Sequence, residues 1–235
     1  MMTHRHDRPR LRIDIVFDTV CPWCFVGKRR MDRALARRPG THAELYWRPF
    51  LLNPDMPPAG LERDAYLEAK FGGQHRAQRV FGAVKTAGDA VGISFAFDRI
   101  ERTPATIDSH RLVRFAEAHG RQADAVEALF QAYFIDGRDI GDSGVLLDIA
   151  RHLDLDADAL RTFLRSEAGI AEVFNDNTRS HRLGVSGVPC FIFNESYAVA
   201  GAQEVDVFLR LIDLAVESGS PRVLTPAASA SHSRG

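Results

Sequence analysis

The chain has few cysteines, almost no net charge and no long apolar run. Its 235 residues include three cysteines, too few for a secreted scaffold held together by disulfides. The formal net charge of −1 gives no electrostatic reason to expect a nucleic-acid or membrane partner. No apolar run approaches the ~18 residues that a membrane-spanning helix needs, and no apolar stretch of ~7–15 residues follows the basic start as in a signal peptide. We therefore expect a cytoplasmic protein.

The first part of the chain predicts a parallel βαβ unit. Apolar residues alternate with other residues over 11–18, which indicates a strand, and a helical pattern follows from Pro22 to about residue 38. Residues 43–51 have the composition of a second strand. A strand, a helix and a strand in this order form a parallel pair with a right-handed crossover.

The other half of the sheet is predicted near the end of the chain. Cys190–Phe193 and Tyr197–Ala200 are short strand-like runs at hairpin spacing, and residues 204–217 follow as an amphipathic helix. Together with the βαβ unit, these elements predict an α/β fold with a compact four-stranded mixed sheet.

A large helical block separates the two halves of this sheet. We predict one unit from residues 10–54 and 184–217, with residues 55–183 as an all-helical insertion. Its helical patterns, separated by Gly, Pro and Asp, cover residues 62–71, 74–91, 107–119, 123–135, 144–153 and 157–183. We expect residues 1–9 and 218–235 to be disordered because they are basic or rich in Ser, Pro and Ala.

The segment Cys21-Pro22-Trp23-Cys24 lies at the turn from the first strand into the first helix. Free backbone N–H groups and the positive end of a helix dipole stabilise a thiolate at such a place, so from the sequence we expect the pKa of Cys21 to lie below the usual ~8.5. Cys24 lies one turn further along, on the apolar face of the helix. Cys21 is therefore the candidate nucleophile, and Cys24 is the candidate resolving thiol.

Two other interpretations of the cysteine pair are weaker. A structural zinc needs four ligands, but there is no second Cys-x-x-Cys, and His4 and His6 lie in the terminus ahead of the first strand. We therefore predict no metal. A redox-inactive binding module or holdase chaperone on the same scaffold is expected to have lost a cysteine or Pro189, and this chain has kept all three residues.

The second signal is Gly187-Val188-Pro189, directly before the strand Cys190–Phe193. A proline can open a strand, and a cis X–Pro bond at such a place is a deliberate feature. Taken alone, an ordinary trans proline is the more frequent case. Together with the Cys-x-x-Cys motif, we predict a cis Val188–Pro189 bond that faces the cysteines.

With these motifs the sequence resembles the DsbA-like branch of the thioredoxin superfamily, and most closely its FrnE-like subgroup, over about residues 10–217. The resemblance is carried by residues 18–27 (DTVCPWCFVG), 48–54 (RPFLLNP), 108–112 (DSHRL) and 184–189 (GVSGVP). It implies a thioredoxin fold with a helical insertion. It also implies dithiol–disulfide exchange with protein or low-molecular-weight thiols, with Cys21 as nucleophile, Cys24 as resolving thiol and Pro189 beside them.

The same branch includes the glutathione-dependent 2-hydroxychromene-2-carboxylate isomerases, which are the alternative enzyme class. Those enzymes typically carry Ser at the position of Cys21, which argues against that chemistry here. Asn53-Pro54 resembles part of their glutathione site, so glutathione or another low-molecular-weight thiol stays open as a co-substrate. We expect no other cofactor. Monomer and homodimer both stay open.

The candidate residues for substrate contact, besides the catalytic Cys21, Cys24 and Pro189, are Pro22, Trp23, Val188, Phe50, Asn53 and His110. We expect Trp23 to be exposed beside Cys21, and Val188 to dock a substrate backbone. For Phe50 the expectation is a core position with an edge on the cleft. His110 lies on an insertion helix, where a surface or capped histidine is the more ordinary outcome.

Two further expectations concern the surroundings of the cysteine pair. The insertion leaves after the second strand and returns just before Pro189, so it should cover the catalytic end of the sheet. Cys190 follows Pro189 in a strand, where successive side chains alternate, so it should face away from the pair as a structural thiol. The two residues between the cysteines are Pro22-Trp23, whereas the periplasmic oxidases have Pro-His there. This pair tunes the stability of the thiolate, so the resemblance does not imply an oxidising reduction potential.

Overall fold

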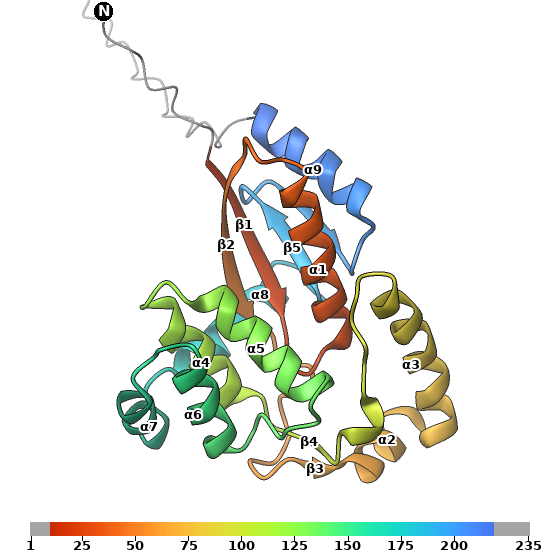
Figure 1. Ribbon diagram of the computed structural model, residues 1–235, viewed down its shortest axis with the longest axis vertical. Helices are drawn as coiled ribbons and strands as arrows, with labels where there is room; N and C mark the ends of the chain where they lie inside the picture. Colours follow the sequence, from red (N-terminus) through yellow and green to blue (C-terminus); the bar gives the residue numbers. More distant parts are fainter. Residues whose placement is uncertain (1–9, 219–235) are drawn as a thin grey trace, which may run out of the picture.

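The computed structural model describes residues 10–218, and Figure 1 shows a sheet with a block of helices at one end. The strand order is β2-β1-β5-β6. β1 (Arg10–Phe17) pairs in parallel with β2 (His42–Pro49) and antiparallel with β5 (Cys190–Phe193). β6 (Tyr197–Ala200) completes the sheet antiparallel to β5, so the predicted mixed sheet is confirmed.

The two faces of β1 pack into different apolar clusters, because successive side chains point to opposite faces of a strand. Its residues Leu11, Ile13, Ile15 and Phe17 belong to the main apolar core. This core also includes buried side chains of α1 (Pro22–Ala36) and α9 (Val205–Ser218), which contact each other. Val16 belongs instead to a small separate apolar cluster on the other face.

The insertion is helical apart from one short pair of strands, β3 and β4. Its elements are β3 (Leu61–Glu62), α2 (Arg63–Phe71), α3 (Gln74–Asp89), the 3-10 helix η1 (Phe97–Arg99), β4 (Arg102–Thr103), α4 (Ile107–Glu117), α5 (Gln122–Phe134), α6 (Ser143–His152), α7 (Ala157–Arg165) and α8 (Ile170–Arg182). The strand pair β3–β4, with two residues in each strand, is a departure from the all-helical insertion expected from the sequence. It joins the start of α2 to the segment ahead of α4.

The stretch expected as one helix over residues 157–183 is two helices. α7 ends at Arg165, and Gly169 precedes α8 with a φ of +82°, a left-handed conformation that favours glycine. A Cβ on Gly169 would lie 2.8 Å from the ring of Phe163, so the close approach also requires a residue without a side chain.

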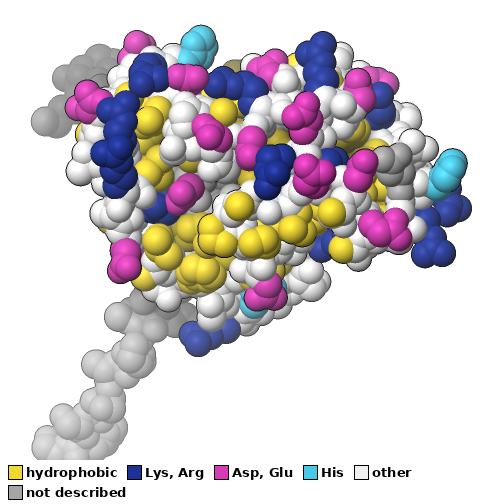
Figure 2. Space-filling view, turned by 90° about the horizontal axis from the view of Figure 1, so that it is seen from below, with side chains coloured by type: hydrophobic (Ala, Val, Ile, Leu, Met, Phe, Trp, Pro, Cys, Tyr) yellow, Lys and Arg dark blue, Asp and Glu magenta, His cyan; other side chains and the backbone are white. Residues whose placement is uncertain are grey.

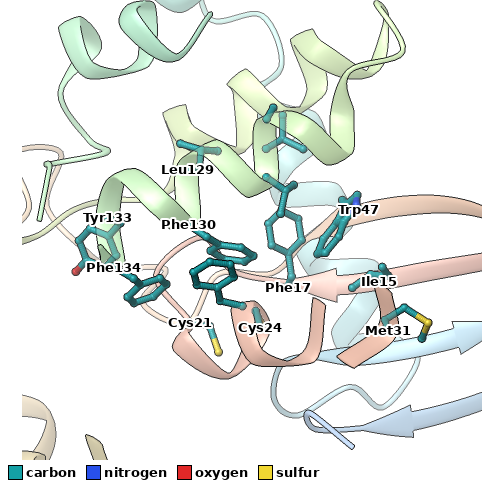
Figure 3. Packing of buried hydrophobic residues seen from close by; sticks show 14 of the residues in the cluster. Ile15, Phe17, Cys21, Cys24, Met31, Trp47, Leu129, Phe130, Tyr133 and Phe134 are labelled. Carbon is teal, nitrogen blue, oxygen red and sulfur yellow. The ribbon is translucent and has the colours of Figure 1, made fainter. Parts of the chain in front are cut away.

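One continuous apolar core runs from the sheet into the insertion. Phe25 of α1 stacks on Phe130 of α5 with 5.1 Å between ring centroids, and Phe17 at the end of β1 meets Phe130 edge-on at 6.2 Å. Figure 3 shows Phe17 and Phe130 packed beside the start of α1, where Cys21 and Cys24 lie. Aromatic pairs of this kind add about 0.5–1.5 kcal/mol each beyond their burial, so they stabilise the packing of the insertion against the end of the sheet that lies beside Cys21 and Cys24.

Some expectations fall outside these residues. The predicted disordered termini lie outside the described residues except for Ser218, which is the last residue of α9. Among the described helices none is long and apolar enough to cross a membrane.

Candidate active site

Cys21 and Cys24 occupy the first turn of α1. Cys21 is the N-cap residue in an extended conformation, and Pro22 opens the helix, where its missing N–H costs nothing. The Cys21 N–H donates to the Asp18 carbonyl at 3.1 Å, and the Cys24 N–H donates to the Cys21 carbonyl at 3.0 Å. Both cysteines are free thiols, with 4% and 1% of their surface exposed. Burial therefore separates the two thiols less than expected, although Cys21 is the more exposed.

The loop before β5 lies against this turn. The Val188–Pro189 peptide bond is cis, and the Cys21 thiol donates to the Val188 carbonyl at 3.5 Å. Gly27, one helical turn beyond Cys24, allows the close approach, because a Cβ there would meet Pro189 Cγ and the ring of Phe191 at 3.1 Å. The sheet, the loop and the helix thus bring the two sequence motifs together.

Cys24 lies in an environment that disfavours its thiolate. Burial raises the pKa of Cys24 well above its usual value, and the hydrogen bond with the Cys21 thiol raises it further. The main chain of Asp18 acts in the other direction through a hydrogen bond. The Cys24 thiol is therefore protonated near neutral pH, when the pair is reduced.

A cavity of about 230 Å³ opens beside Cys21. One side comes from the sheet unit, with Val20, Leu52, Val188 and the residues Cys21, Pro22 and Trp23. The insertion supplies an aromatic wall: Tyr66, Phe71, Phe81, Phe97, Tyr133 and Phe134. The insertion thus covers the end of the sheet beside Cys21, as the chain path predicts. Seen from the end that carries α2 and β3–β4, apolar side chains form a band across the surface between charged residues (Figure 2).

The cavity has cationic groups and, among its lining residues, no carboxylate. Arg63 donates to Thr103 Oγ1 at 3.0 Å and lies over the ring of Phe81, with 5.2 Å to the centroid. The exposed Lys70 donates to Asn53 Oδ1 at 3.2 Å. Arg63 also lines an adjoining cavity of about 710 Å³ between α2 and α3. An anionic group near Cys21 would therefore meet two positive charges.

Tyr66 lies between this cavity and the loop after β2. The Asn53 amide lies 3.4 Å from its hydroxyl group. Burial raises the pKa of Tyr66 above its usual value, although Asn53 and Arg63 lower it in part. Tyr66 is therefore a neutral hydrogen-bonding group at the cavity wall.

The structure brings some of the predicted contact residues to the cavity and not others. Pro22, Trp23 and Val188 line it, and Asn53 supports two of its lining side chains from the loop behind. Phe50 is buried on the other face of the sheet, 4.8 Å from the ring of His181. Its edge does not line the cavity, because residue 50 follows the end of β2 on the side away from α1. His110 is fully buried, neither at the surface nor in the cavity lining.

Cys190 lies in the small apolar cluster with Val16, Phe50 and Val185. It pairs with Val16 in the β1–β5 register, so it shares the face of the sheet that is opposite Phe17. Burial raises the pKa of Cys190, and no charged group contributes to that shift. The predicted orientation of Cys190 agrees with the structure, and its redox inertness stays a prediction.

Several site residues were not singled out from the sequence. Asp18 is three residues before Cys21 at the end of β1, and its position in the motif was the available signal. Arg63, Tyr66 and Lys70 lie on one face of α2, at steps of three and four residues. That spacing shows that the three share a face, but nothing in it shows that the face meets Cys21.

A profile of the DSBA-like thioredoxin domain matches residues 12–213. The chain belongs to this family. A structure of a probable DsbA oxidoreductase from Streptomyces coelicolor is similar, with 31% identity, a TM-score of 0.81 and coverage of 92% of this chain and 94% of that chain.

Two more distant structures share the fold. A cytosolic disulfide reductase DsbM from Pseudomonas aeruginosa with GSH has 19% identity and a TM-score of 0.58, covering 88% of this chain and 96% of that chain. A 2-hydroxychromene-2-carboxylate isomerase has 15% identity and a TM-score of 0.63, covering 88% and 95%. The isomerase class that the sequence left open as an alternative therefore shares this fold as well.

Proposed function

We propose that this DsbA-like protein is a thiol–disulfide oxidoreductase that exchanges a Cys21–Cys24 dithiol for a disulfide with protein or low-molecular-weight thiol substrates. The placement of the two thiols carries the proposal. Cys21 caps the start of α1 and lines a cavity, while Cys24 lies buried one turn behind it. This arrangement supports one attacking and one resolving thiol.

The chemistry follows from these positions. The Cys21 thiolate attacks one sulfur of a substrate disulfide, a mixed disulfide forms, and the other substrate sulfur leaves as a thiolate. Cys24 then loses its proton and attacks Cys21 Sγ, and the remaining substrate sulfur leaves with the electron pair. The protein has lost two electrons to become the Cys21–Cys24 disulfide, and the substrate has gained them as two thiols. The reverse sequence oxidises a dithiol substrate.

The cavity favours a thiol substrate with an apolar part and a negative charge. Its aromatic wall gives apolar contact area, and Arg63 and Lys70 supply charge complementarity. Glutathione, which is present in the structure of the Pseudomonas neighbour, has a thiol and a net negative charge that would suit Arg63 and Lys70, and it is our proposed co-substrate. That neighbour is named as cytosolic, which favours the same compartment for this protein.

The deciding experiment measures the reduction potential of the Cys21/Cys24 couple together with turnover of glutathione disulfide and of a disulfide-bonded protein. We expect one reversible two-electron couple and turnover that Cys21→Ser abolishes. A second arm adds glutathione and a chromene carboxylate. A protein with no redox couple, or with isomerase turnover that survives Cys21→Ser, would contradict the proposal.

A further inference from the structure

The cavity beside Cys21 is too small to hold more than the part of a substrate that lies next to the reacting sulfur. Its volume of about 230 Å³ is below the ~300–1,000 Å³ of typical ligand sites. A substrate larger than a small thiol must therefore extend past this cavity. The adjoining cavity of about 710 Å³ between α2 and α3 has room for the rest of such a substrate.

The two cavities share part of their wall. Arg63, Phe81 and Phe97 line both of them. Phe81 stacks on Phe97 with 4.6 Å between ring centroids, and the Arg63 guanidinium lies over the ring of Phe81, with 5.2 Å to the centroid. A chain whose sulfur lies at Cys21 can therefore continue over this wall into the larger cavity.

The larger cavity combines an apolar floor with an excess of negative charge. Its apolar side chains come from α2, α3 and the segment around η1, and they are Leu67, Ala77, Phe81, Phe97 and Ile100. Its charged lining residues are the acidic Glu62, Asp64, Asp98 and Glu101 and the basic Arg63 and Lys85. Four carboxylates against two cations leave the lining negative, and all four belong to exposed residues at the edge of the cavity.

Three of these carboxylates are free to meet a ligand. Within the described residues, the side chains of Glu62, Asp98 and Glu101 make no hydrogen bond and no ion pair. The backbone brings two of them together, because Glu62 pairs with Arg102 between β3 and β4 and the Arg63 N–H donates to the Glu101 carbonyl at 2.8 Å. Their negative charges are therefore not neutralised by the fold.

The form of the cavity favours a cation on an apolar stem over a metal ion. In the part of the chain that the structure describes, no three His, Cys, Asp or Glu side chains are grouped so that they could hold a metal. Lysine and arginine side chains have an aliphatic stem that packs on apolar surface and a charged head that stays at the edge. The floor suits the stem, and the exposed carboxylates suit the head.

We propose that the cavity between α2 and α3 binds a lysine or arginine side chain of a polypeptide substrate, close in sequence to the cysteine that exchanges with Cys21. The inference rests on the proposed function and narrows its substrate class. The stem of the bound side chain lies on the floor that includes Phe81 and Phe97, and its charged head lies among the three unpaired carboxylates.

Opposite charges in the two cavities orient such a substrate. The cavity beside Cys21 has Arg63 and Lys70 and, among its lining residues, no carboxylate, whereas the larger cavity has more carboxylates than cations. A basic side chain near the reacting cysteine is repelled from the first cavity and attracted to the second. An acidic side chain at the same position loses this interaction.

The test uses peptides that are joined through a single cysteine to thionitrobenzoate. Cys21 of the reduced protein attacks the peptide sulfur and thionitrobenzoate leaves; Cys24 then attacks Cys21, and the peptide leaves as a thiol while the Cys21–Cys24 disulfide forms. Each peptide carries lysine, norleucine or glutamate at one of the positions before or after the cysteine. Norleucine keeps the aliphatic stem without the charge. The rate of thionitrobenzoate release is divided by the rate with dithiothreitol, which corrects for the intrinsic reactivity of each peptide.

At the best position we expect the lysine peptide to react at least about fivefold faster than the norleucine peptide, with the glutamate peptide slowest. The double variant Glu62→Gln/Glu101→Gln should lower this lysine-to-norleucine ratio to less than about twofold. The matched control is Glu172→Gln/Glu217→Gln, which removes two exposed carboxylates that line neither cavity and should leave the ratio unchanged.

The wild-type comparison of lysine with norleucine does not depend on the folding of any variant. A lysine peptide that reacts no faster than norleucine at every position overturns the inference. A ratio that Glu62→Gln/Glu101→Gln leaves unchanged, or that the control lowers equally, overturns it as well. A wild-type protein in which no peptide produces the Cys21–Cys24 disulfide contradicts the proposed function instead.

Discussion

The two sides of the sheet each hold a buried thiol, Cys24 under the start of α1 and Cys190 at the start of β5. Burial raises the pKa of both. Around Cys24 there are also the Cys21 thiol and the Asp18 carboxylate, whereas the cluster around Cys190 is apolar. From this difference we expect a thiol that is only buried, such as Cys190, to be inert, and a thiol that is buried beside a second sulfur and a polar group, such as Cys24, to take part in exchange.

We expect the largest effect when Cys24 and Cys190 are each replaced separately. Cys24→Ser should lower dithiol turnover on the order of 10³-fold and leave substrate attached to Cys21, because no thiol remains to resolve the mixed disulfide. The measurement is turnover together with mass spectrometry of the trapped protein. Cys190→Ser is the control and should form no trapped species. Trapping in the Cys190 variant would remove the distinction between the two sides.

The second prediction compares the three thiols by their rates of alkylation. In the folded, reduced protein at pH 8, iodoacetamide should modify Cys21 at least about tenfold faster than Cys24 or Cys190, because a raised pKa lowers the thiolate fraction. In urea all three should react alike. Peptide mass spectrometry at timed intervals gives the rates. If Cys190 reacts as fast as Cys21 in the folded state, the apolar cluster does not protect it.

The third prediction compares the cavity beside Cys21 with a cavity on the opposite face of the sheet. Lys70→Gln should raise the KM for glutathione disulfide about fivefold, the effect of losing roughly 1 kcal/mol of charge interaction at an exposed site. The KM for an uncharged disulfide should not change. Arg179 lines a cavity of about 390 Å³ at the back of the sheet, so Arg179→Gln is the matched control. If both variants raised the KM for glutathione disulfide equally, the cause would be the net charge of the protein and not the cavity beside Cys21.

These comparisons also show what the sequence could predict. The alternation in β1, the Cys-x-x-Cys turn and the strand after Pro189 depend on residues close together in the chain, and each was predicted near its observed place. The bounds of Cys190–Phe193 and Tyr197–Ala200 agree with the structure. The break at Gly169 was missed because the apolar pattern continues across it, and glycine inside a helical pattern is a weak signal.

The contacts within the site depend on distant segments and could not be predicted. Asp18 and His110 are 92 residues apart, and their contact requires α4 to pack against the end of β1. The Lys70–Asn53 hydrogen bond also depends on how α2 lies over the loop after β2. A local pattern fixes which face of a helix is polar, whereas tertiary packing fixes what that face meets.

The smallest expected effect concerns the apolar side alone. Cys190→Ala should leave turnover within about twofold and lower the free energy of unfolding by about 1 kcal/mol at pH 7, because a small cavity replaces the buried sulfur.

That difference in the free energy of unfolding should shrink as the pH rises above the usual thiol pKa of ~8.5. The folded-state pKa of Cys190 is raised, so its contribution to stability is complete below the unfolded pKa and is lost as the pH rises towards the folded one. Urea unfolding of both proteins in reductant, at pH 7 and at pH 10, measures the change, and the contributions of the other titrating groups cancel because both proteins contain them. A difference that stays constant with pH would mean that Cys190 ionises as easily in the folded chain as in the unfolded one.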